Sequence, residues 1–135
     1  MQITRQADYA VHAVLYLAQM KHGDRTATST VAKEQHIPPS FLAKIISQLS
    51  TAGLLHTSRG VHGGVILARE PKDITLLEVI EAIDGPVQFN ECVGSDRDCT
   101  FGDHCPIKSV WCQAQEELVV RLKNTNFAQL AAKAV

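Results

Sequence analysis

The residues with the clearest capacity for chemistry are the four cysteines, which all lie between residues 92 and 112. Six residues separate Cys92 from Cys99, five separate Cys99 from Cys105, and six separate Cys105 from Cys112. Glycines and acidic residues fill the gaps between the first three, which predicts a loop at about 90–105 with little to bury. A bound metal would supply the missing order, because thiolate–metal bonds contribute folding free energy.

The spacing of these cysteines limits which metal or cluster they could bind. It lacks the Cys-x(2–4)-Cys knuckle of structural zinc sites and matches neither common ferredoxin pattern. Three thiolates on one loop suit a soft metal or an iron–sulfur cluster and leave the fourth ligand open. Cys112 follows on a predicted helix, where a small buried hydrophobe beside Trp111 is an equally good interpretation. A thiol switch without any metal is a further alternative.

Composition predicts a single globular domain in a reducing compartment. The chain has 135 residues, of which 45% are hydrophobic, so it can bury a core. The sequence has no apolar run of the roughly 18 residues that span a membrane, and its first residues do not resemble a signal peptide. We therefore expect a cytoplasmic protein with no membrane partner, in which clustered cysteines are ligands or redox sensors rather than disulfides.

Charge is distributed unevenly along the chain. Residues 1–72 carry eight Lys and Arg against four Asp and Glu, a balance of +4, whereas residues 73–135 carry five against ten, a balance of −5. Five of the six histidines also lie in the first half. A polyanion such as DNA would therefore bind the first half in preference to the second.

The segment from Thr30 to Leu49 has the pattern of a helix-turn-helix. Val31 and Ala32 face inward on its first helix, and Pro38-Pro39 forbids helix continuation before Ser40. His36 occupies the turn position where such units usually place Gly, and His tolerates positive φ better than most residues. The buried face of the second helix is predicted to contain Leu42, Ile45, Ile46 and Leu49.

A β-hairpin is predicted directly after the helix-turn-helix, which together make a winged helix. Two β-prone runs, Leu54–Ser58 and Val65–Ala68, flank a Gly-rich tip. Polar residues on the second helix suit base edges and phosphates, and an Arg at the wing suits a phosphate or a narrow minor groove. The predicted DNA-binding residues are Ser40, Lys44, Ser47, Gln48, Arg59 and His62.

Helices are predicted for most of the remaining chain. A first helix starts at Thr4 or Asp8 and ends at Gly23-Asp24, and Thr75 caps a core helix over Leu76–Asp84. A helix over about 106–123 is longer than a 135-residue monomer easily covers, which predicts dimerisation, and Phe127–Val135 is a short terminal helix. The predicted fold is mainly α with a small β-hairpin wing. Its winged helix-turn-helix domain spans 1–72, and a cluster-binding loop and dimerisation helix occupy 73–135.

Four features together resemble the Rrf-two family of bacterial winged-helix repressors, which includes iron–sulfur cluster regulators of the IscR type and nitric-oxide sensors of the NsrR type. The resemblance covers nearly the whole chain. It rests on Ile3-Thr4-x-x-x-Asp8-Tyr9-Ala10, on Arg59-Gly60-x-x-Gly63-Gly64, on Ile74-Thr75-Leu76-x-Glu78-Val79-Ile80 with Asp84, and on the three-cysteine loop.

The resemblance implies a homodimer that binds a palindromic operator in double-stranded DNA. Cys92, Cys99 and Cys105 match the family's three cluster cysteines, with one extra residue in the first gap. In IscR-type members a His three residues after the last cysteine completes a [2Fe–2S] site, but Lys108 stands there in this chain. In NsrR-type members an Asp of the other subunit completes a [4Fe–4S] site, and Asp8 stands at the matching position.

The resemblance therefore favours a [4Fe–4S] cluster with Asp8 as the fourth ligand, while [2Fe–2S] stays open and His104 and Cys112 are rival ligands. Its implied function is a transcriptional regulator, in the manner of a repressor, that senses nitric oxide, redox state or iron–sulfur status. The alternatives are a cluster-free thiol-switch regulator and an iron–sulfur electron carrier. The sequence has no nucleophile–base constellation and no phosphate-binding loop, so we expect neither an enzyme nor a small-molecule substrate.

Overall fold

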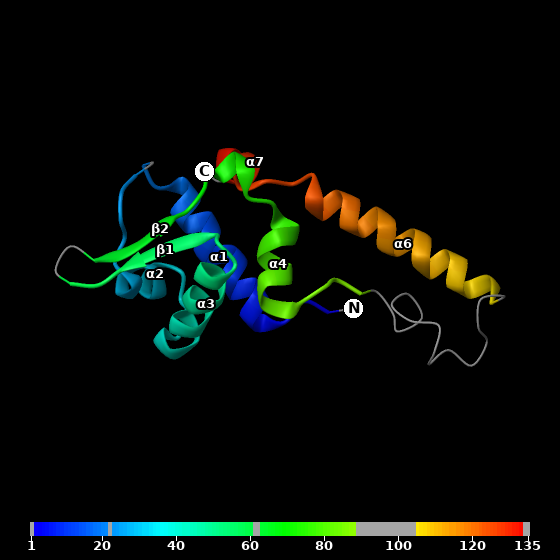
Figure 1. The fold of residues 1–135 in the computed structure, drawn as a ribbon, viewed down its shortest axis with the longest axis horizontal. Helices are drawn as coiled ribbons and strands as arrows, with labels where there is room; N and C mark the ends of the chain where they lie inside the picture. The colour runs from blue at the N-terminus through cyan, green and yellow to red at the C-terminus, as the bar shows by residue number, and fades with distance from the viewer. Residues whose placement is uncertain (1, 22, 61–62, 89–104, 134–135) are drawn as a thin grey trace.

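The computed structural model describes residues 2–21, 23–60, 63–88 and 105–133. Helices form most of it, and one two-stranded antiparallel sheet projects at one end (Figure 1). The predicted fold class, mainly α with a β-hairpin wing, is confirmed. In chain order the elements are α1 (Arg5–Gln19), α2 (Thr28–Glu34), α3 (Pro39–Thr51), β1 (Leu55–Ser58), β2 (Gly64–Leu67), the 3-10 turn η1 (Pro71–Asp73), α4 (Leu76–Asp84), α6 (Pro106–Lys123) and α7 (Phe127–Lys133).

Helices α2 and α3 form the predicted helix-turn-helix. The turn between them places His36 at φ 54°, in the left-handed region, as its position in the motif predicted. Ile37 is buried directly after it and anchors the turn in the core. The buried face of α3 is also as predicted, and it consists of Leu42, Ile45, Ile46 and Leu49.

The hairpin forms the wing and is tied to the segment before α2. Strand β1 pairs with β2 from Leu55 opposite Leu67 to Ser58 opposite Gly64. Thr26 adds a single antiparallel bridge to Val65, with N–O distances of 3.1 and 2.8 Å. A Cβ atom on Gly64 would lie 2.6 Å from the Thr26 carbonyl oxygen, so this close approach requires glycine.

A single core joins the two halves of the chain. Ile74, Val79 and Phe127 are buried in the same cluster as Val14 and Leu49. Backbone hydrogen bonds from Leu76 to Thr125 (2.8 Å) and from Phe127 to Ile74 (3.1 Å) return the chain to this core after α6. The division into domains at residue 72 stays a prediction.

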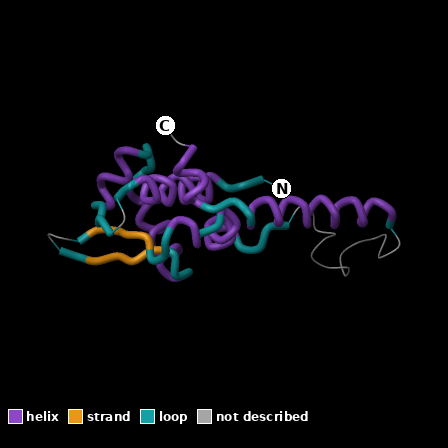
Figure 2. Tube along the Cα trace, turned by 90° about the horizontal axis from the view of Figure 1, so that it is seen from above, coloured by secondary structure: helices purple, strands orange, loops and turns teal. Residues whose placement is uncertain are grey.

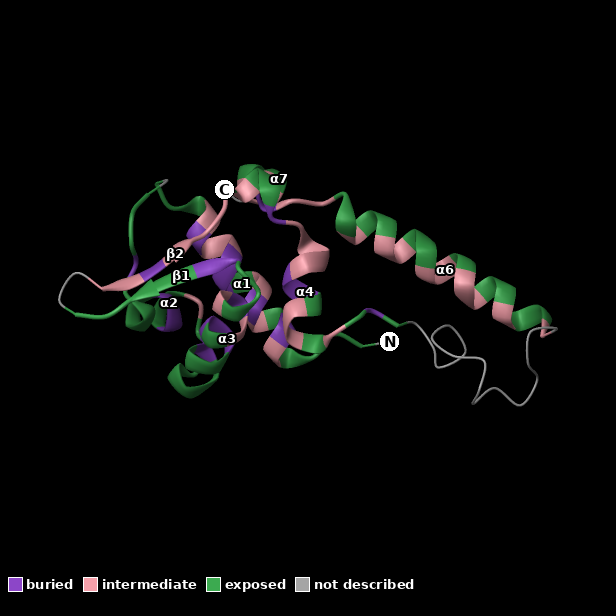
Figure 3. Cartoon of the chain, in the orientation of Figure 1, coloured by how far each residue is buried: buried purple, intermediate pink, exposed green. Residues whose placement is uncertain are grey.

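Helix α6 differs from the other elements because it extends away from the core (Figures 1 and 2). Its 18 residues are all described, and none of them is buried (Figure 3). Its bounds match the predicted 106–123. Helix α1, in contrast, ends four residues before the predicted Gly23, because the backbone of Met20 is already extended (ψ 158°) on the way to the bridge at Thr26.

Thr75 is the N-cap of helix α4, as predicted, and it forms a complete capping box with Glu78. The Glu78 backbone N–H donates to Thr75 Oγ1 at 3.1 Å, and the Thr75 N–H donates to Glu78 Oε2 at 3.0 Å. Arg69 Nη1 pairs with Glu78 Oε1 at 3.0 Å. Partial burial raises the pKa of Glu78, but the hydrogen bonds from Thr75 and Arg69 and the charge of Arg69 outweigh it, so this pKa lies below its ordinary value of 4.5.

The lowered pKa predicts that the Glu78 carboxylate stabilises the fold above pH 4.5 and that this contribution is lost as the pH falls through its folded-state pKa. Glu78→Gln keeps a capping-box residue but removes the charge. We expect it to lower the free energy of unfolding at pH 7 by about 0.5 kcal/mol, because the pair is partly exposed. Urea unfolding at pH 7 and pH 3 measures this difference, which should be smaller at pH 3 because part of the carboxylate's contribution is lost below pH 4.5.

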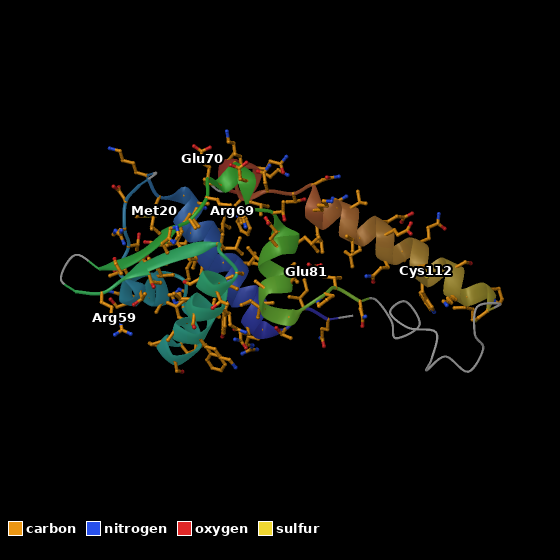
Figure 4. The ribbon with its side chains drawn as sticks, in the orientation of Figure 1. Met20, Arg59, Arg69, Glu70, Glu81 and Cys112 are labelled. Atoms are coloured by element: carbon orange, nitrogen blue, oxygen red, sulfur yellow. The ribbon has the colours of Figure 1, made fainter. Side chains whose placement is uncertain are left out.

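Glu81→Gln, on the exposed side of the same helix, is the matched control for the loss of one negative charge (Figure 4). A difference between wild type and Glu78→Gln that stays constant from pH 7 to pH 3 would contradict the role given to the carboxylate.

Candidate nucleic-acid interface and metal-binding segment

The polar face of α3 is displayed to solvent over most of its length. Ser40, Lys44 and Ser47 recur at spacings of four and three residues, so they share one side of the helix, and all three are exposed. Thr51 continues this side and donates its hydroxyl to the Ser47 carbonyl at 3.0 Å. An exposed helix face of this kind offers one cation and several hydroxyl groups to a polyanion.

The prediction that the polar face of α3 is exposed along its whole length is wrong at Gln48. This residue is half-buried at the edge of that face, because its Oε1 accepts a hydrogen bond from Gln6 Nε2 of α1 at 2.8 Å. The Nε2 donors of Gln48 are not part of this bond. They can still donate to a DNA acceptor, and the role of Gln48 in binding stays a prediction.

The wing displays a second arginine that the sequence did not reveal. Arg59 follows β1 and is exposed at the far end of the hairpin (Figure 4). Arg25 is also exposed, and its Nη1 donates to the hydroxyl of Ser58, the residue before Arg59 in the chain. Local pattern could not show this, because Arg25 and Ser58 lie 33 positions apart in the chain and the Thr26–Val65 bridge brings them together. The predicted His62 lies outside the described residues.

Two of the four cysteines fall within the described residues. Cys105 is the N-cap residue of α6, and Cys112 lies in the same helix (Figure 4); both are half-buried free thiols. Cys92, Cys99 and His104 lie outside the described residues. Within the parts of the chain that are described, no group of three His, Cys, Asp or Glu side chains could hold a metal ion.

Asp8 lies in the first turn of α1, as predicted. Its side chain is 63% exposed, and its Oδ1 lies 3.6 Å from His12 Nε2. The same turn is fixed to the end of α4, because the Thr4 hydroxyl donates to Asp84 Oδ1 at 2.6 Å and accepts from the Ala7 N–H at 3.1 Å. Asp8 is thus an available carboxylate on a rigidly held helix terminus.

Comparison with known proteins decides the family. A family model described as Rrf2, iron-dependent transcriptional regulator, matches residues 3–133. The chain belongs to the Rrf2 family. It is 31% identical to the HTH-type transcriptional regulator IscR of Klebsiella pneumoniae, over 96% of this chain and 79% of that protein. This confirms the resemblance to the Rrf-two family that the motifs indicated.

The fold of this chain is the same as that of solved structures of Rrf2 regulators. IscR of T. potens superposes with a TM-score of 0.80 at 27% identity, over 100% of this chain and 89% of that one. CymR, the global cysteine regulator of B. subtilis, superposes with a TM-score of 0.82 at 26% identity, over 100% and 99%.

The protein is therefore a DNA-binding transcriptional regulator of the Rrf2 family, and the expectation of a regulator rather than an enzyme is confirmed. None of the described helices is both long and apolar enough to cross a membrane.

The position of Arg25 beside the wing predicts that it contacts a DNA phosphate. Arg25→Ala should weaken DNA binding to a similar degree for all sequences and reduce the slope of log K against log salt by about 0.9, the value for one phosphate contact. Lys72→Ala is the control, because Lys72 lies in η1 and pairs with Glu70. Fluorescence anisotropy across a salt series measures the slope. An unchanged slope in Arg25→Ala would remove Arg25 from the interface.

Proposed function

We propose that the protein is a homodimeric repressor whose operator binding is controlled by an iron–sulfur cluster. The ligands would be Cys92, Cys99 and Cys105 of one subunit and Asp8 of the partner subunit. One observation supports this most strongly: the cysteine segment leads at Cys105 directly into α6, a helix of which no residue is fully buried. The sensory segment and the proposed subunit interface are therefore continuous in the chain.

The chemistry at Cys105 fits a bound cluster. Cys105 caps α6, and no acidic residue lies in the first turn of that helix. Thiolates are the ligands that iron–sulfur clusters prefer, and no carboxylate beside Cys105 in this turn would repel one. When bound, such a cluster supplies iron that reacts with nitric oxide and oxygen. Lys108 in place of a family His supports [4Fe–4S] over [2Fe–2S].

The fourth ligand is better supplied by Asp8 than by Cys112. Cys112 lies seven positions beyond Cys105, so their backbones lie about 10.5 Å apart along the helix axis. Reaching one cluster with both thiols would strain or unwind the start of α6. Asp8 is exposed and lies on another element, which suits a ligand that crosses to a partner subunit. A carboxylate is also a hard, weakly held ligand for iron among thiolates, so this tie would break readily.

The surface of α6 supports a homodimer. Ile107, Val110 and Val120 are 55%, 58% and 54% exposed, an unusual degree for large aliphatic side chains on one helix. An open groove of about 1080 Å³ lies between α6 and α7, and its lining combines Leu118, Val120 and Leu130 with charged residues such as Glu117 and Arg121. A second α6 would cover this apolar surface by helix-on-helix packing. Two-fold symmetry of the dimer would then require a palindromic operator.

A dimer built on α6 should separate when a charge is placed in its apolar surface. We expect Val110→Asp to raise the dimer dissociation constant at least tenfold, because a carboxylate would be desolvated at the interface. Sedimentation equilibrium measures this, with the exposed Gln113→Asp as the matched control on the same helix. A Val110→Asp protein that remains dimeric at nanomolar concentration would place the interface elsewhere.

The ligand set is tested on anaerobically purified protein by Mössbauer spectroscopy with iron and sulfide counts. Wild type should show a [4Fe–4S] signal, and Asp8→Ala should lose or alter it because the fourth ligand is missing. Asp24→Ala, which removes another exposed carboxylate, is the control. Asp8→Ala protein that retains both the cluster and its response to nitric oxide would contradict ligation by Asp8. A [2Fe–2S] signal indifferent to Asp8 would return the role to His104 or Cys112.

A cluster-free thiol switch is the second candidate. It is favoured by the two half-buried free thiols of α6 and by the likeness to CymR, the global cysteine regulator of B. subtilis. Cys105 and Cys112 cannot bond to each other within an intact helix, because disulfides require Cα atoms less than about 7 Å apart. Such a switch would therefore use Cys92 or Cys99. Wild-type protein without iron, together with DNA binding that responds to a thiol oxidant, would establish this alternative.

A further inference from the structure

Phe41 is an aromatic side chain that the core does not use. It lies in the first turn of α3, next to Ser40, and is 49% exposed. Of the aromatic residues that the structure describes, Phe41 alone is classed as exposed; Tyr9, Tyr16 and Trp111 are half-buried and Phe127 is buried. Phe41 is not among the four buried residues of α3.

The ring of Phe41 is nevertheless held in position. Its centroid lies 6.2 Å from that of Tyr9 on α1, and the two planes are tilted by 59°. Tilted aromatic pairs at this separation are attractive beyond the area that they bury. Tyr9 therefore supports one side of the Phe41 ring and leaves another side open to solvent, beside the exposed polar face of α3.

The second helix of a helix-turn-helix lies in the DNA major groove, and α3 is that helix here. The chemistry of the groove limits what an exposed phenyl ring on this helix can recognise. Base edges present hydrogen-bond donors and acceptors, which a phenyl ring cannot satisfy, and the C5-methyl group of thymine, which is apolar. Phosphates likewise offer nothing to an uncharged ring. The thymine methyl group is thus the groove feature that complements Phe41.

We propose that Phe41 is a specificity-determining residue that contacts a thymine methyl group in each half of the operator, with Tyr9 as its positioning residue. This inference rests on the proposed binding of α3 to operator DNA. A contact that buries one methyl group is worth about a fourfold change in affinity per half-site. Two symmetric half-sites give about a fifteenfold change for the dimer.

The experiment uses duplexes selected from a random pool by anaerobically purified wild-type protein. Each thymine shared by the two half-sites is replaced in turn with deoxyuridine, which lacks only the methyl group, and dissociation constants are measured for wild type and Phe41→Ala. At one symmetric position, wild type should bind the deoxyuridine duplex about fifteenfold more weakly than the thymine duplex. Phe41→Ala should bind both duplexes equally, at the weaker level. Tyr9→Leu should retain part of the discrimination, because the Phe41 ring remains but loses its support.

Two results would overturn the inference. One is that wild type binds every deoxyuridine duplex as tightly as the thymine duplex. The other is that Phe41→Ala still prefers the thymine duplex over the deoxyuridine duplex as strongly as wild type does. Either result leaves DNA binding itself intact, whereas selection of no duplex at all would count against the proposed function. Urea unfolding of both variants separates these effects from a loss of fold.

Discussion

The packing of α1 is the constraint on which the rest of the structure depends. Ala7, Ala10 and Ala13 recur every third residue and are buried, and such small side chains let other helices approach closely. Helices α3, α4 and α7 and strand β2 all pack against α1. Both the helix-turn-helix and the C-terminal half are thus positioned on the same central helix.

The first two turns of α1 have a further consequence for function. Thr4 binds Asp84 at the end of α4, Gln6 binds Gln48 of α3, and Tyr9 supports Phe41 of α3. Asp8 lies among them with its carboxylate exposed. If Asp8 of the partner subunit is a cluster ligand, its release would remove a tie at the helix end that supports the DNA-binding helix. An allosteric switch requires such a difference in contacts between two states.

Local sequence pattern predicted most of the fold. Periodicity, proline positions and capping residues act over a few residues, and they predicted the helix-turn-helix with His36 in its turn, the N-cap at Thr75 and the bounds of α6. The features that sequence did not predict depend on contacts distant in the chain. The segment after α1 pairs with the hairpin through Thr26 and Val65, Arg25 bonds to Ser58, which lies 33 positions away, and Gln6 bonds to Gln48, which lies 42 positions away.

The central claim is that the cysteine segment controls DNA binding through a cluster. Its most direct test is the dissociation constant for a selected duplex, measured anaerobically before and after stoichiometric nitric oxide, with Cys99→Ser protein as the comparison. The account predicts that nitric oxide weakens wild-type binding at least tenfold, and that Cys99→Ser binds weakly throughout. Wild-type affinity that does not change, in protein whose iron has demonstrably reacted, would contradict it.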